Sequence, residues 1–144
     1  MHAAVDPAEL RLVVGSATFH AVLHPQQAPR TCAAILARLP LQHQLVHARW
    51  SGEAMWMPFG DERLDVPWED PTSYPSPGQL LLFPGGISEM EILLPYGPTR
   101  FASKAGQLAG NHFATIVEAG AALAAVGRRV LYEGAQMVRI EAVR

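Results

Sequence analysis

Apolar and polar residues alternate along several short segments of this chain, which is the period of a β-strand with one buried face. Residues 10–14 and 17–23 are two such segments, and Gly15-Ser16 between them is typical of a hairpin turn. Similar runs predict further strands at residues 43–50, 53–57, 79–83, 89–94 and 137–143, and one that ends at residues 116–117. So many short strands are typical of a β-barrel.

Two other segments have the spacing of a helix. Residues 30–39 carry apolar side chains along one side of a helix, with Pro29 at its start and Pro40 at its end. Residues 119–126 are rich in alanine and predict a short helix that ends at Gly127. The chain is therefore predicted to be mostly β, a closed barrel capped by two short helices.

A proline-rich segment, residues 61–77, interrupts the predicted strands and contains Trp68 and Tyr74. Its prolines predict a loop. Loops of this length within a compact domain are often functional or part of an interface. We therefore expect Trp68 and Tyr74 to lie outside the core, where they could close a binding site.

The composition indicates a single ordered domain over residues 1–144. Hydrophobic residues make up 49% and charged residues 17%, which argues against disorder. The formal net charge of −2 provides no basic surface for nucleic acid, and no apolar run approaches the roughly 20 residues that span a bilayer. The single cysteine, Cys32, excludes an intramolecular disulfide, and the N-terminus lacks the apolar segment of a signal peptide. We expect a cytoplasmic protein without nucleic-acid or membrane partners.

Most of the candidate chemistry lies in residues 101–118. Lys104 is the only lysine among 11 basic residues, and it could neutralise an anionic ligand or act as a base. His112 could act as a general acid or base, or be a core histidine bonded to the backbone. Ser103 and Asn111 could orient a ligand by hydrogen bonding, although Gly-Asn is also ordinary turn chemistry.

Carboxylates provide a second group of candidates. Glu89 and Glu91 fall on one face of the strand predicted at residues 89–94, where they could transfer protons, hold a cation, or simply face solvent. Glu53 lies in sequence between Trp50 and Trp56, and a carboxylate buried among aromatic rings has a raised pKa.

Metal and cofactor sites are not predicted. His20 with His24, and His43 with His47, have the spacing of a zinc pair on a helix, but both pairs fall in predicted strands without a third ligand. The glycines form neither a dinucleotide-binding nor a phosphate-loop pattern.

Two parts of the chain resemble cyclophilins. The corner Pro25-Gln-Gln-Ala-Pro29-Arg30-Thr31 is similar to the Pro-x-x-x-Pro-[Lys/Arg]-Thr pattern that precedes their first helix. Leu108-Ala-Gly-Asn-His112 and Phe113-Ala-Thr-Ile-Val-Glu118 are similar to their Leu-Asp-Gly-Lys-His segment and the strand after it. The resemblance implies a cyclophilin-like barrel.

The centre of the chain resembles small, uncharacterised bacterial proteins with a cyclophilin-like fold. The segments that carry this resemblance are Trp50-Ser-Gly-Glu-Ala54, Phe83-Pro-Gly-Gly86 and Phe101-Ala-Ser-Lys104. Those proteins are domains of unknown function, so the resemblance implies a fold and no settled activity.

The residues of a prolyl isomerase are mostly absent. His112 matches the position of the histidine that the resemblance to these isomerases implies, but Gln107 stands where they have a tryptophan. Their catalytic arginine follows a strand histidine directly, whereas here Arg49 lies two residues after His47 and Ala48 intervenes. A slip of one residue turns a strand side chain to the other face.

We expect a small polar or anionic metabolite to bind in a pocket on the side of the barrel. Lys104, His112 and Glu89 are the candidate catalytic residues. The candidate ligand-binding residues are Arg49, Trp50, Glu53, Tyr74, Ser103 and Asn111. Three alternatives stay open, namely a small-molecule isomerase or lyase that uses His112 with a carboxylate, a peptidyl-prolyl isomerase, and a non-catalytic homo-oligomeric module with an aromatic interface.

Overall fold

The computed structural model describes residues 8–143, which form a barrel of antiparallel strands with two helices. The strands are β1 (Glu9–Val14), β2 (Ala17–Leu23), β3 (Leu41–His47), β4 (Gly52–Pro58), β5 (Pro71–Thr72), β6 (Gln79–Phe83), β7 (Glu91–Thr99), β8 (Ala102–Ser103), β9 (Gly106–Gln107), β10 (Gly110–Ile116) and β11 (Gln136–Val143). The helices are α1 (Pro29–Ala37) and α2 (Gly120–Glu133).

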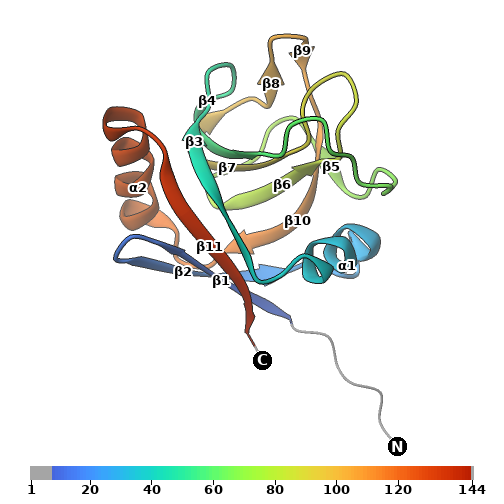
Figure 1. Cartoon of the computed structure of the whole chain (residues 1–144), viewed down its shortest axis with the longest axis horizontal. Helices are drawn as coiled ribbons and strands as arrows, with labels where there is room; N and C mark the ends of the chain where they lie inside the picture. Colours follow the sequence, from blue (N-terminus) through green and yellow to red (C-terminus); the bar gives the residue numbers. More distant parts are fainter. Residues whose placement is uncertain (1–7, 144) are drawn as a thin grey trace, which may run out of the picture.

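Eight strands close the barrel in the order β2-β1-β11-β3-β4-β7-β6-β10 (Figure 1). The closing contact is an antiparallel pairing of β10 with β2, in which Ala114 lies opposite Leu23. β5 extends the sheet beyond β10, while β8 and β9 form a separate hairpin. The predicted closed β-barrel with two helices is therefore confirmed, and so is the hairpin at Gly15-Ser16 between β1 and β2.

Alternation along the strands fills the barrel with apolar side chains. In β1, Leu10, Leu12 and Val14 are buried in the main core, and the residues between them are partly exposed. A side chain every second residue points to the same face of a strand, so the pattern in the sequence maps onto the inside of the barrel.

β6 departs from this alternation because both of its faces are covered. Leu80 and Leu82 belong to the main core, whereas Leu81 and Phe83 belong to a second apolar cluster on the outer face of the sheet. The other members of this outer cluster are Ala54, Leu93, Phe101 and Leu108. The chain that carries Phe101 and Leu108 therefore folds over the outside of β4, β7 and β6.

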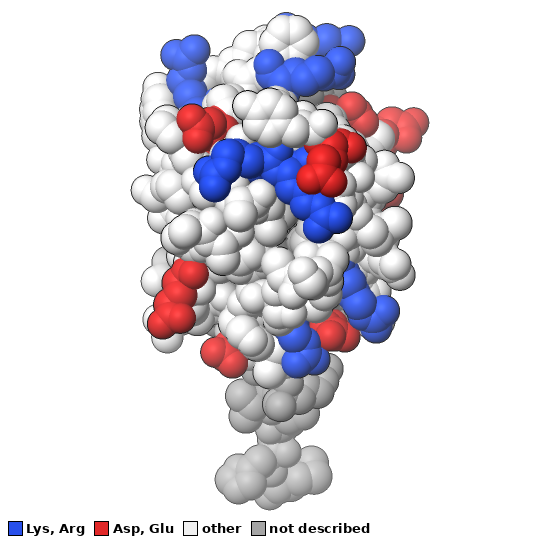
Figure 2. All heavy atoms as spheres, turned by 90° about the vertical axis from the view of Figure 1, so that its left-hand side faces the viewer, with Lys and Arg blue, Asp and Glu red and all other residues white. Residues whose placement is uncertain are grey.

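The two helices lie on opposite sides of the barrel (Figure 1). α2 is longer than predicted, because Gly127 lies inside this helix instead of ending it. A Cβ atom at Gly127 would collide with the ring of Tyr96, so the glycine permits close packing between α2 and β7. On the side of the molecule that faces the viewer in Figure 2, basic and acidic side chains are interspersed.

Among the predicted strands, those at residues 43–50 and 89–94 differ most from the structure in their bounds. β3 ends at His47, so residues 48–50 form the turn to β4, and β7 begins only at Glu91. Glu89 therefore precedes the strand in which it was predicted. In residues 8–143, no helix is long and apolar enough to cross a membrane.

Candidate functional site

A cleft of about 520 Å³ opens on the outer face of the barrel, beside the outer apolar cluster. Four segments surround it: the turn between β3 and β4, residues 60–63, residues 86–89, and the β8–β9 hairpin. The β3–β4 turn and the β8–β9 hairpin lie at the top of Figure 1. Glu91 and Trp56, from β7 and β4, also line the cleft.

Ser51 connects the β3–β4 turn to the segment around β8. Its hydroxyl oxygen accepts a hydrogen bond from the backbone N–H of Ala102 at 3.0 Å and donates one to the carbonyl of the same residue at 3.1 Å. The N–H of Arg100 donates to the carbonyl of Ser51 at 2.9 Å. Ser51, a buried polar residue, therefore fixes one wall of the cleft.

The opposite wall consists of two loops that are hydrogen-bonded to each other. The N–H of Phe59 donates to the carbonyl of Met90 at 2.9 Å, and the N–H of Leu64 donates to the carbonyl of Pro84 at 3.0 Å. Gly85 has a φ of +96°, and a Cβ atom there would come within 2.7 Å of the carbonyl oxygen of Glu62. Only glycine permits such a close approach of two backbone segments, which explains why the first residue of the Gly85-Gly86 turn is a glycine.

Three basic residues, Arg49, Arg63 and Lys104, line the cleft. Among the described residues, none of them has a carboxylate within 4.0 Å. The lining residue Glu62 is different, since it is paired with Arg38 at 3.0 Å. The basic side chains of the cleft are thus free to meet an anion from solution.

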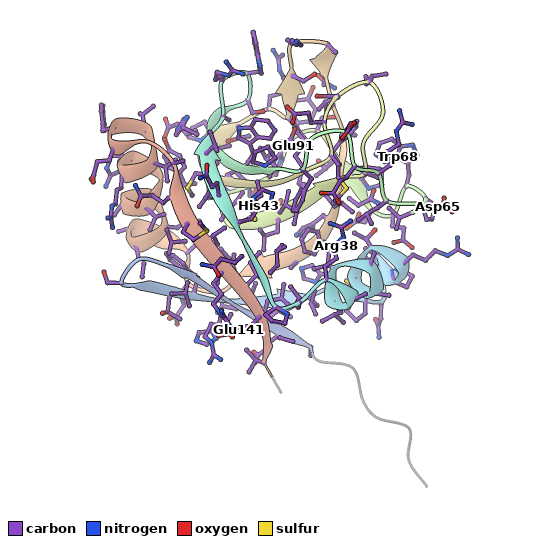
Figure 3. The ribbon with its side chains drawn as sticks, in the orientation of Figure 1. Arg38, His43, Asp65, Trp68, Glu91 and Glu141 are labelled. Atoms are coloured by element: carbon purple, nitrogen blue, oxygen red, sulfur yellow. The ribbon has the colours of Figure 1, made fainter. Side chains whose placement is uncertain are left out.

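Glu91 is the one buried acid of the cleft, with 5% of the residue exposed. In the barrel wall it lies opposite Pro58 of β4 and Phe83 of β6, neither of which offers a side-chain donor. Burial, together with the negative charge of Glu89, raises the pKa of Glu91 to about 8. Its carboxyl group is therefore mostly protonated at neutral pH. Figure 3 labels Glu91 in the upper half of the molecule.

Two tryptophans provide apolar surface in the cleft. Trp50, in the β3–β4 turn, is 56% exposed, and Trp56, in β4, packs partly against the outer apolar cluster. Trp68 does not line the cleft and lies on the loop at the right of Figure 3.

The structure divides the nine predicted site residues into two groups. Five of them line the cleft, and these are Arg49, Trp50, Glu89, Ser103 and Lys104. The other four are not among the lining residues, and these are Glu53, Tyr74, Asn111 and His112. This cleft therefore brings Lys104 together with Arg49 and Trp50, and it does not include Asn111 or His112.

Asn111 belongs to a buried network that we call the anchor network, formed by Thr31, Glu69 and Asn111. The Asn111 side chain donates to the Thr31 hydroxyl at 3.0 Å and to the carbonyl of Pro67 at 2.9 Å, and it accepts the N–H of Glu69 at 3.0 Å. With 0% of the residue exposed, Asn111 holds the proline-rich loop against α1 and β10.

Glu69 completes the anchor network at the first turn of α1. The N-cap residue of this helix, Ala28, has no side chain that can bond the free N–H groups. The Glu69 carboxylate accepts the N–H of Thr31 at 2.8 Å and that of Arg30 at 3.2 Å. Burial alone would raise the pKa of Glu69, but its hydrogen bonds from Thr31 and Arg30 lower it below the ordinary value.

His112 lies in a second cluster of paired groups. His112 Nε2 and His24 Nε2 are each 2.8 Å from the hydroxyl oxygen of Thr115, and His112 Nδ1 is 3.8 Å from a carboxylate oxygen of Asp70. Burial, and then the neighbouring His24, lower the pKa of His112 despite the opposing effect of Asp70. The carboxylate nearest to His112 is thus Asp70 and not an acid of the cleft.

Glu53 and Tyr74 lie elsewhere on the surface. The Glu53 side chain packs against Gly97 and its charge acts on Tyr96, and Glu53 is not among the residues that line the cleft. Tyr74 is 65% exposed, and its hydroxyl lies 3.4 Å from the side-chain oxygen of Gln107.

The sequence did not single out Arg63, and it offered Glu91 only as a carboxylate beside Glu89, outside the nine predicted site residues. The sequence contains a feature that could have pointed to Glu91, because it is an acid at the start of an apolar run. In the structure it shares a strand face with Leu93 of the outer cluster. Arg49 was predicted as a ligand-binding residue on a strand over residues 43–50, but β3 ends at His47 and Arg49 reaches the cleft from the turn. No group of three or more metal-ligating side chains occurs among residues 8–143.

Two solved structures have a similar fold. The structure of McbB in complex with tryptophan matches with a TM-score of 0.68 and 19% identity, over 92% of this chain and 44% of McbB. The chain thus spans less than half the length of McbB. The hypothetical protein AF2241 from Archaeoglobus fulgidus matches with a TM-score of 0.63 and 20% identity, over 95% of each chain.

No curated protein matches the chain. The family described as protein of unknown function (DUF3830) matches residues 10–142. This match covers nearly the whole barrel, from the second residue of β1 to the penultimate residue of β11, and the chain therefore belongs to the DUF3830 family.

Proposed function

We propose that this chain is a cyclophilin-like barrel that binds a small anionic metabolite in the cleft on its outer face. The observation that carries the proposal is the set of three basic residues, Arg49, Arg63 and Lys104, that line one cleft without a carboxylate partner among the described residues. The cleft is also lined by Asp61, Glu62 and Glu89, but a basic side chain without an ion-pair partner can pair with an anionic ligand.

The size and the apolar surface of the cleft also support a small ligand. A volume of about 520 Å³ lies within the range of small-molecule sites. Trp50 and Trp56 offer flat apolar surfaces, so a ligand with an aromatic or other planar part is favoured over a bare ion.

Thermal unfolding with a panel of carboxylates, phosphates, amides and proline peptides tests the proposal. Tryptophan belongs in the panel because McbB was solved with it. A ligand at 100 times its dissociation constant stabilises the folded state by about 2.7 kcal/mol, which raises the melting temperature measurably. We expect a shift with anions only.

A matched pair of variants locates the site. Lys104→Ala should reduce the shift by about half, whereas Arg128→Ala, which removes an exposed charge of α2 outside the cleft, should preserve it. A shift with proline peptides alone would favour a prolyl isomerase. No shift with any compound would favour the interaction module, which size-exclusion chromatography would then test.

A further inference from the structure

Glu91 differs from every other acid of the cleft in its surroundings. Asp61, Glu62 and Glu89 are exposed, whereas Glu91 is 5% exposed and makes no hydrogen bond to another described residue. Fully buried polar side-chain atoms without a partner do not occur in residues 8–143. The unbonded carboxyl oxygens of Glu91 therefore reach the surface of the cleft, where a ligand can meet them.

The residues around Glu91 favour its neutral form. Pro58 and Phe83 flank it in the sheet, and the closest charge that acts on it is the carboxylate of Glu89. The other charged groups around the cleft are Arg49 of the β3–β4 turn, Asp61, Glu62 and Arg63 of the next loop, and Lys104 of the β8–β9 hairpin. Burial, and then the negative charge of Glu89, raise the pKa of Glu91 to about 8.

We infer that Glu91 acts as a neutral acid that donates a hydrogen bond to the carboxylate of the bound ligand, so that the cleft selects carboxylates with a planar apolar part. This inference rests on the proposed function, because it assigns the ligand class of the same cleft. The cations attract the carboxylate, the indoles of Trp50 and Trp56 contact the apolar part, and Glu91 contributes the proton between two carboxyl groups.

The proton balance of this arrangement is simple. Below the pKa of Glu91, the carboxyl group already holds the proton, and the anion binds without any exchange with the solvent. Above it, an ionised Glu91 would repel the carboxylate, so that each ligand that binds must bring one proton with it. The affinity for a carboxylate therefore falls by about tenfold for each pH unit well above 8.

Three probes of equal size separate the charge classes, namely benzoate, benzamide and benzylamine. Their binding to the full chain is followed by tryptophan fluorescence between pH 6.5 and 9.5, with low salt held constant. We expect benzoate to bind best at pH 7 and to lose affinity by about 30-fold at pH 9.5. We expect benzamide and benzylamine to bind at least 10-fold more weakly than benzoate at pH 7.

The variant Glu91→Gln isolates the role of the proton, because an amide keeps a donor and cannot ionise. We expect it to bind benzoate at pH 7 within about threefold of the wild type and with no loss of affinity up to pH 9.5. Glu91→Ala removes the hydrogen-bond donor and should lower the affinity for benzoate by about tenfold at pH 7. Thermal unfolding confirms that each variant is folded.

The outcomes distinguish this inference from the proposed function. Benzoate that binds with the same pH profile in the wild type and in Glu91→Gln would overturn the role of Glu91 and leave the anion site intact. Loss of benzoate binding in a folded Glu91→Gln would also overturn it, since the amide keeps a hydrogen-bond donor. Tighter binding of benzylamine than of benzoate would overturn it as well, since Glu91 would then act as an anion. If no anion of the wider panel binds, the inference fails together with the proposed function.

Discussion

The cleft and the anchor network are both rich in polar side chains, but they differ in how these groups are paired. In the anchor network, Asn111 and Glu69 bond to backbone and side-chain groups of three separate segments. In the cleft, Arg49, Arg63 and Lys104 have no carboxylate partner among residues 8–143, and Glu91 has no hydrogen bond there.

This difference distinguishes polar groups that stabilise the fold from polar groups that can still bind a ligand. A buried group whose bonds are complete contributes to stability and has little left to offer a ligand. A buried or crowded group whose bonds are incomplete keeps that capacity for a molecule from solution. The comparison predicts that variants in the anchor network change stability, and that variants in the cleft change binding.

The largest effect is expected from Asn111→Ala. It removes three hydrogen bonds and leaves the Pro67 carbonyl and the Glu69 N–H without partners, so the free energy of unfolding should fall by about 4 kcal/mol. Urea denaturation measures this change. Lys104→Ala is the matched cleft variant and should change stability by less than about 0.5 kcal/mol. An equal loss of free energy of unfolding in the two variants would contradict the distinction between the anchor network and the cleft.

The next largest effect is the dependence of stability on pH at Glu91. The pKa of about 8 in the folded chain exceeds its value of 4.5 in an unfolded one, so the folded protein binds the extra proton between these pH values. The stability that this proton contributes is complete below pH 4.5 and is lost as the pH rises towards 8, by about 1 kcal/mol for each unit.

Glu91→Gln should remove this slope, because glutamine does not titrate. Urea denaturation at pH 5, 6, 7 and 8 should show the variant gaining stability relative to the wild type as the pH rises. Glu133→Gln, an exposed acid of α2, is the control and should keep the wild-type slope. If the free energy of unfolding of Glu91→Gln still falls with pH as in the wild type, the pH dependence arises from another titratable group.

A smaller effect is expected from Lys104→Ala on ligand affinity. Loss of one partly solvated cation should lower the affinity for benzoate by about tenfold, which corresponds to about 1.4 kcal/mol of binding free energy. Fluorescence titration at pH 7 measures it, and Lys104→Arg, which keeps the charge, should recover most of the affinity. If affinity is unchanged, Lys104 is a solvated surface residue.

The smallest effect is expected from Glu69→Gln at the start of α1. The amide replaces one carboxylate oxygen by a donor and weakens the bonds from Thr31 and Arg30, which should cost about 1 kcal/mol at pH 7. Because the pKa of Glu69 is lowered in the folded chain, this contribution is present above pH 4.5 and is lost as the pH falls further. The difference between variant and wild type, measured by urea denaturation, should therefore vanish in acid.

The fold could be predicted largely from local patterns, and the site only in part. Strands such as β6, with the bounds Gln79–Phe83, follow from apolar runs between turn residues. The end of α2 was missed because glycine in a sequence indicates a helix end, while here Gly127 meets the ring of Tyr96 from a distant strand. His112 was assigned to the cleft because of its neighbours in sequence, whereas its partners are His24, Asp70 and Thr115.

Sequence alone determined that the chain is a β-barrel. The alternation of apolar and polar residues indicates which side chains of each strand are buried, and this can be inferred before the pairing of the strands is known. The sequence also identified residues 101–118 as a segment in which polar candidate residues gather, of which Ser103 and Lys104 line the cleft. The sequence already grouped Lys104 and Ser103 with Arg49 and Trp50. Only the tertiary structure decided that Arg63 and Glu91 line the same cleft, while the side chain of Asn111 is bonded within the anchor network. The physical reason is that pairing depends on contacts between residues far apart in the chain, and these contacts decide which polar groups are satisfied and which remain available to a ligand.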